Sequence, residues 1–125
     1  MVLNINGTDY ELKFGIRFVR ELDKRYFTTG QNGYKFGIGV EIKIPMLLTG
    51  DVVTLAEFIH LGTVSEKKRP SVQEIDEFVD NAEDIETIFD EVIEELKKQN
   101  ATKMKMVEFE RVLKAETEAM KNKTA

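Results

Sequence analysis

The sequence predicts an α+β domain, mainly α, in which an N-terminal β-hairpin packs on a bundle of about five to six helices. Three observations support this fold class. Apolar and polar residues alternate over residues 2–14, segments with helical apolar spacing fill most of the remaining chain, and 125 residues without cysteine are enough to bury a core without disulfides. We expect one domain over residues 1–104 and an amphipathic, loosely docked helix over residues 105–125.

Residues 2–14 have the pattern of a half-buried hairpin. Asn6 and Gly7 interrupt the alternation, and Asn-Gly is the dipeptide most typical of a two-residue turn between strands. The apolar side chains of the two strands fall on one face: Leu3, Ile5, Tyr10, Leu12 and Phe14. Because an isolated hairpin is only marginally stable in water, we expect it to pack on the helix that follows directly.

That helix begins after Gly15, where the apolar spacing changes from two residues to three or four. Its predicted buried stripe is Phe18, Val19, Leu22 and Tyr26. The next segment, "TTGQNGYKFGIG" at residues 28–39, has the glycine content of a loop. We interpret it as a loop and exclude a phosphate-binding one, because no Gly-Lys-Ser/Thr follows.

Residues 38–48 fit two structures. Ile38, Val40, Ile42 and Ile44 alternate as in a strand, whereas Val40, Ile44, Leu47 and Leu48 make a helical stripe. Pro45 disfavours either element unless it lies near an end. Periodicity alone leaves the choice between strand and helix open.

Capping residues mark the starts of three further helices. Asp51 can cap a helix that ends near Gly62, Ser71 and Glu74 form a capping box, and Asp84 can cap the next helix. The apolar faces of these helices are Val52, Leu55, Ala56 and Ile59; Val72, Ile75 and Val79; and Ile85, Ile88, Phe89, Val92 and Leu96.

A last helix is expected at about residues 103–121. Met106, Phe109, Leu113 and Met120 share one side of it, and Glu116 interrupts their stripe. Core packing is the ordinary fate of such a stripe, but a sparse, Met-rich face near a basic chain end also suits a changing partner surface. We predict that these four residues bind a partner, and that deleting residues 105–125 costs little stability.

Charge is distributed unevenly. Residues 1–70 carry 10 basic and 8 acidic residues, residues 71–96 carry 11 acidic and none basic, and residues 97–125 carry 8 basic and 4 acidic. This pattern argues against nucleic-acid binding, which needs a net basic face, and favours protein partners. The acidic segment is either solvated helix surface or a docking site for a basic partner. With no secretory signal and no apolar run of roughly 18–20 residues, we expect a cytoplasmic protein without a membrane partner.

We find no pattern typical of an enzyme. Cysteine is absent, and His60, the only histidine, has no recognisable nucleophile as its partner. The best calcium-loop register begins at Asp80, but it places Ala82 at a ligand position and Ile85 where the loop needs glycine. We therefore expect no catalytic residue, no cofactor and no metal.

The order of four segments resembles the tail assembly chaperones of long-tailed, siphovirus-type phages and prophages of Gram-positive bacteria. The segments are "YELKFGIRFVRELDKRY", "FGIGVEIKIPMLLTGDVVTLAEFI", "RPSVQEIDEFVDN" and "DIETIFDEVIEELKKQNATKM". The family pattern treats residues 38–48 as helical, and we adopt that interpretation.

The resemblance implies a chaperone that binds the tape measure protein, and that helps to recruit the tail-tube protein before leaving the finished tail. A small structural tail or connector protein of the virion is the alternative. We also expect some self-association, because the glycine-rich loop and the open hairpin edge can both support it.

Overall fold

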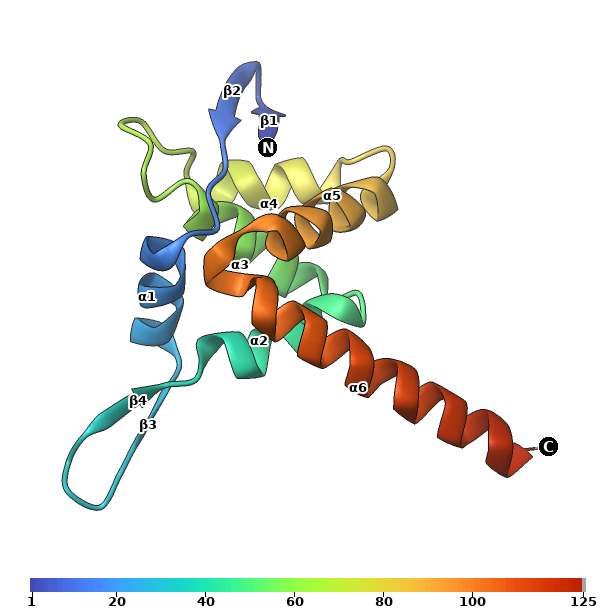
Figure 1. Ribbon diagram of the computed structural model, residues 1–125. Coiled ribbons are helices and arrows are strands. Elements are labelled where there is room, and N and C mark those ends of the chain that lie inside the picture. Colours follow the sequence, from blue (N-terminus) through green and yellow to red (C-terminus); the bar gives the residue numbers. More distant parts are fainter. Residues whose placement is uncertain (125) are drawn as a thin grey trace.

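The computed structural model describes the backbone of residues 1–124 and the side chains of residues 1–123. Within this range the chain is mainly helical, with two separate two-stranded antiparallel sheets, which confirms the predicted fold class (Figure 1). The elements are β1 (Val2–Ile5), β2 (Thr8–Glu11), α1 (Ile16–Arg25), β3 (Phe27–Thr29), β4 (Lys35–Gly37), α2 (Gly39–Leu48), α3 (Val52–Gly62), α4 (Val72–Asp80), α5 (Ile85–Lys98) and α6 (Asn100–Thr124).

The N-terminal hairpin has the predicted turn. Ile5 pairs with Thr8, so Asn6 and Gly7 form a two-residue loop with φ of 54° and 85°. Positive φ at both positions is what the primed turn requires, and glycine adopts it without steric cost. Strand β1 contacts α4, and the apolar face of the hairpin joins the core.

Three aromatic rings connect the hairpin to the helices. Phe14, which follows β2, meets Phe18 of α1 edge-on with ring centroids 5.0 Å apart, and Phe18 meets Phe58 of α3 in the same way at 5.1 Å. All three side chains are fully buried. Edge-to-face packing of this kind adds to the stabilisation that burial alone provides.

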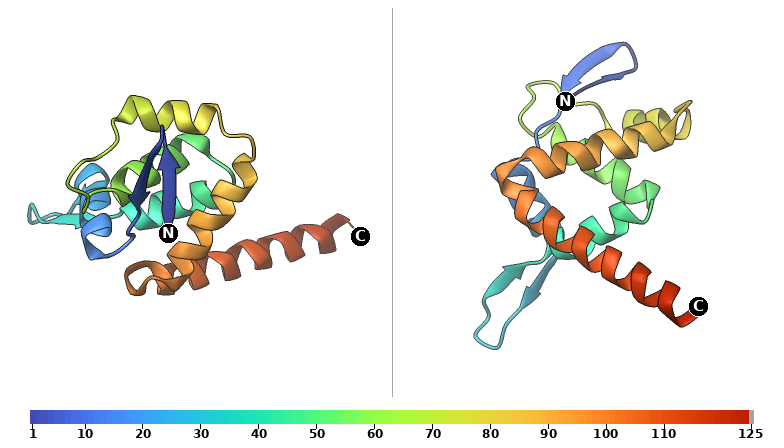
Figure 2. Two further views of the ribbon diagram at one scale, coloured as in Figure 1. Left: turned by 90° about the horizontal axis from the view of Figure 1, so that it is seen from above. Right: turned by 45° about the vertical axis from the view of Figure 1, so that its right-hand side comes forward.

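The glycine-rich segment is not the loop that we predicted. Strands β3 and β4 pair in the register Phe27 with Gly37 and Thr29 with Lys35, and the hairpin projects away from the helices (Figures 1 and 2). Each strand has three residues, and glycines surround the turn, so neither strand shows alternation over a length that periodicity can detect. We call residues 27–37 the arm.

Residues 39–48 form a helix, so the strand alternative was wrong and the helical interpretation is confirmed. Gly39 lets α2 begin directly against α1, since a Cβ there would lie 2.6 Å from Leu22 Cγ. The Gly39 amide donates to the Asp23 carboxylate at 3.0 Å. Pro45 lies inside the helix and cannot donate to the carbonyl one turn earlier; α2 ends three residues later.

All three predicted caps are present. The Asp51 carboxylate accepts from the Val53 amide at 3.2 Å, and the Asp84 carboxylate accepts from the Thr87 amide at 3.2 Å. Ser71 begins α4 with a complete capping box, in which its hydroxyl accepts from the Glu74 amide. These bonds satisfy amides that have no partner within the helix and so fix where each helix starts.

Helix α6 is continuous across the boundary predicted at residues 104/105. A tight corner at Gln99 joins α5 to α6, and the buried Thr102 hydroxyl in the first turn of α6 donates to the Leu96 carbonyl at 2.6 Å. The first half of α6 packs on α5, α2 and α1, and the second half extends beyond the body in a different direction from the arm (Figure 2).

Candidate partner-binding surfaces

The four residues predicted to bind a partner lie along α6 in different environments. Met106 is fully buried in the core, and Phe109 packs against the core while partly exposed. Leu113 is half-buried, and Met120 is exposed near the far end of the helix. The stripe therefore begins as core and becomes surface where α6 leaves the body, so Met106 is unavailable to a partner while the helix is docked.

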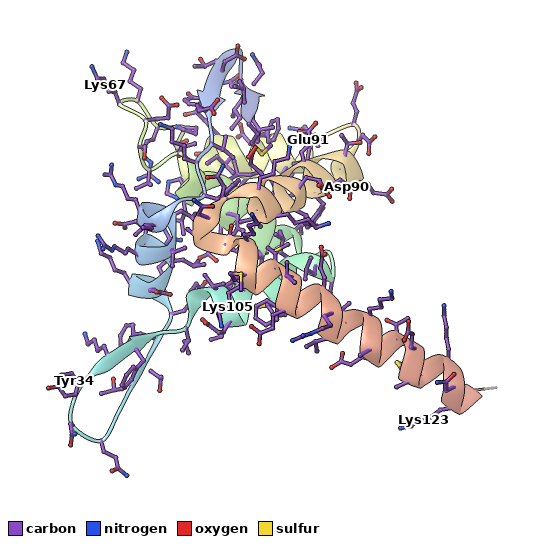
Figure 3. All side chains as sticks on the ribbon, viewed as in Figure 1. Tyr34, Lys67, Asp90, Glu91, Lys105 and Lys123 are labelled. Atoms are coloured by element: carbon purple, nitrogen blue, oxygen red, sulfur yellow. The ribbon has the colours of Figure 1, made fainter. Side chains whose placement is uncertain are left out.

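Two ion pairs hold the first half of α6 in place. Lys97 Nζ of α5 lies 3.0 Å from Glu110 Oε1, and Lys105 Nζ lies 3.2 Å from Glu41 Oε1 of α2. Hydrogen bonding to these carboxylates raises the pKa of Lys97 and that of Lys105. Figure 3 shows Lys105 beside α2, whereas Lys123 lies at the distant end of the helix. Both pairs are solvated, so they orient the helix more than they stabilise it.

A polar cluster between α1, α2 and α3 is not predicted by the sequence analysis. Lys43 is buried, with Nζ 3.6 Å from Glu57 Oε1 and 5.1 Å from the centroid of the Tyr26 ring. The Tyr26 hydroxyl donates to Glu57 Oε2 at 2.8 Å, and Arg25 pairs with the same oxygen at 3.0 Å. Burial, followed by the Glu57 carboxylate, raises the pKa of Tyr26.

This cluster has a structural role. Its polar groups bond to one another, and among the described residues no buried side-chain polar atom lacks a hydrogen-bond partner. Removing Glu57 would leave the buried Lys43 ammonium without its carboxylate partner, which is costly. The only sequence signal was Lys43 between Ile42 and Ile44, where a charged residue interrupts an apolar segment.

The remaining titratable candidates give no reactive site. His60 is half-buried, and burial followed by the charges of Arg69 and Arg25 lowers its pKa. No group of three or more potential metal ligands occurs within residues 1–123. Acidic residues such as Asp90 and Glu91, labelled in Figure 3, lie on the outer face of α5.

A groove of about 440 Å³ runs between α3 and α4. We call it the α3–α4 groove. Its apolar lining is Val52, Val53, Ala56, Val72 and Val79. Asp76 and Asp80 of α4 add two carboxylates, and Arg25 and Glu57 complete the lining. Val52, Val53 and Val72 are exposed, so the groove presents apolar surface to water.

The arm is the second exposed apolar feature. Phe27 is 43% exposed, Tyr34 69% and Phe36 56%, and the Lys35 ammonium lies 4.7 Å from the centroid of the Phe27 ring. Tyr34 lies near the tip in Figure 3. Three exposed aromatic side chains on one small hairpin form the kind of apolar surface that is typical of interaction sites.

Comparison with known protein families gives a match over most of the chain. The family model described as phage tail assembly chaperone protein (TAC) matches residues 2–110. No curated protein and no solved structure matches the chain. The match contains the whole body, the arm and the docked half of α6, and it ends where α6 leaves the body. Within the described residues, no helix has the length and apolar character needed to cross a membrane.

Proposed function

The chain belongs to the phage tail assembly chaperone family, and on this premise we propose that it binds the tape measure protein and assists assembly of the tail tube in the host cytoplasm. Membership of the family implies an assembly role rather than catalysis. The proposal includes the tail-tube protein as a second partner, which the chaperone helps to recruit before it leaves.

The projecting half of α6 supports this proposal. Leu113 and Met120 continue the face that Met106 and Phe109 begin, and they do so beyond the body, where a second helix can lie alongside. A long helical partner with an exposed apolar face would cover these side chains. Because methionine adapts its shape to irregular surfaces, one helix could serve several sites along such a partner.

The size of this surface suits reversible binding. Few apolar side chains are exposed on the projecting half, so a single contact falls below the area of a permanent interface, which is about 2,000 Å² or more. An assembly factor must dissociate when its partner is finished. Weak docking of one exposed helix allows that release.

Binding to the tape measure protein of the same phage tests the proposal. The full-length variant Leu113→Ser with Met120→Ser should bind at least about tenfold more weakly in calorimetry, because it removes the apolar face. Val107→Ser is the matched control, since Val107 is exposed and helical spacing places it on the other side of α6. Equal binding by both variants would contradict a role for this face.

A structural tail or connector protein is the alternative function. Mass spectrometry of purified virions separates the two, because a chaperone that leaves should be absent from mature particles. Finding the chain as a stoichiometric component would overturn the proposed function. If the Leu113→Ser, Met120→Ser variant binds the tape measure protein as tightly as the parent, and the chain is absent from virions, the chain is a chaperone whose binding surface lies outside this face of α6.

A further inference from the structure

The arm and the α3–α4 groove complement each other in chemistry. The arm offers Phe27, Tyr34 and Phe36 together with the cationic Lys35, and the groove offers valine side chains together with Asp76 and Asp80. Helix α4 as a whole carries four acidic residues and no basic one. Aromatic rings would cover the valines while the lysine meets the carboxylates.

We propose that the arm of one copy of this chain docks in the α3–α4 groove of a second copy. Charge argues for this occupant, since the helix that leads into the arm also carries exposed cations at Arg17 and Arg20. The contact uses none of the α6 residues proposed to bind the tape measure protein. It can therefore be tested without that protein.

The position of the groove favours a reciprocal exchange. Arg25 lines the groove and lies two residues before the arm begins, so the base of the arm adjoins the groove in one molecule. The arm itself points away from the body (Figure 2). Two copies related by a twofold axis near Arg25 can each place an arm over the other's groove, which is the self-complementary geometry of most dimers.

The area also favours exchange of both arms. Each of the three aromatic side chains has about 200 Å² of surface, and roughly half of that is exposed. Together they expose about 300 Å² on one arm. One arm and its groove would bury about 600 Å², which is too little for a specific interface, whereas two reciprocal contacts bury about 1,200 Å². That value is at the lower limit for a specific dimer, so we expect dissociation at low concentration.

Sedimentation velocity of the full chain from about 1 μM to about 1 mM should show a reversible monomer–dimer equilibrium. Phe36→Ser should raise the dissociation constant at least about tenfold, while Val107→Ser, a similarly exposed apolar residue on α6, should leave it within about twofold. A chain that is monomeric at the highest concentration, or a dimer that Phe36→Ser leaves unchanged, would overturn the proposal.

Charge exchange tests the pairing directly. Lys35→Glu and Asp80→Lys should each weaken the dimer, and the combined variant should recover most of the loss, because each arm then meets a groove of opposite charge. Glu91→Lys on α5 makes the same charge change as Asp80→Lys outside the groove and should have little effect. A combined variant weaker than both single variants would overturn the pairing.

Because the chain has no cysteine, disulfide trapping identifies the contact without background. Mixed under mild oxidation, Tyr34→Cys and Val53→Cys chains of different mass should form the mixed disulfide faster than either identical pair. Faster formation of the Tyr34→Cys pair would instead show that arms join along their open strand edges, and it would refute docking in the groove.

Discussion

Replacing Met106 by alanine tests whether the first half of α6 packs against the core and stabilises the fold. The side chain is fully buried, whereas its neighbour Val107 is 62% exposed on the same helix. Alanine is the best helix former, so neither Met106→Ala nor Val107→Ala weakens the helix itself. Any difference between the two variants then reports packing of this face against the body.

The expected loss for Met106→Ala is about 3 kcal/mol, within the range of about 2–5 kcal/mol for truncating a buried methionine or leucine. The Lys105–Glu41 pair and the buried Thr102 hydroxyl both precede Met106 and keep this part of α6 on the body, so we expect relaxation to fill the cavity only in part. For a domain of this size the melting temperature should fall by about 9–15 °C. Val107→Ala should stay within about 0.5 kcal/mol of the parent.

Urea unfolding followed by circular dichroism, with thermal melting beside it, measures both variants. Deleting residues 114–125 leaves the buried part of α6 and the Lys97–Glu110 pair intact and should cost less than about 1 kcal/mol. Deleting residues 105–125 also removes Met106, so the structure now predicts a large loss where the sequence predicted a small one. Equal stability of Met106→Ala and Val107→Ala would refute a docked α6.

Three further predictions concern the fold. Gly39→Ala should cost about 1–3 kcal/mol in urea unfolding, because its Cβ would lie 3.0 Å from the Leu22 backbone. Ser71→Ala should lose about 1 kcal/mol in the same assay by removing the capping box. Because burial lowers the pKa of folded His60, the unfolded chain binds more protons near its ordinary pKa of 6.5. Unfolding free energy should therefore fall as the pH drops from about 7.5 to about 5.5, and His60→Gln should reduce that slope.

The features that the sequence predicted well are local ones. The turn at Asn6 and Gly7 and the caps at Asp51, Ser71 and Asp84 are all present as expected. Asn6 and Gly7 themselves adopt the backbone conformation of the turn. Each capping residue itself accepts a hydrogen bond from an amide two or three positions later in the chain. Such signals need no knowledge of the rest of the fold.

The features that periodicity left open or missed depend on distant residues. Periodicity left residues 38–48 open, and the helix there, which we adopted from the family resemblance, begins where Gly39 meets Leu22 of another helix, a contact that periodicity cannot contain. Lys43 can be buried because the Glu57 carboxylate of α3 and the ring of Tyr26, which follows α1, lie beside its ammonium. The stripe on α6 gave no sign of where the body ends, so Met106 and the exposed residues beyond it had the same pattern in sequence.

The two projections share a property that bears on assembly. The arm and the far half of α6 both carry apolar side chains into water, yet each offers too little area for tight binding alone. A dimer joined by its arms would present two copies of α6 to one long partner, and the second contact would form at an effective concentration in the millimolar range. Two weak helices could then hold a partner firmly while the dimer persists. Separation of the arms would return each copy to weak binding, so the concentration of free chaperone could control its release.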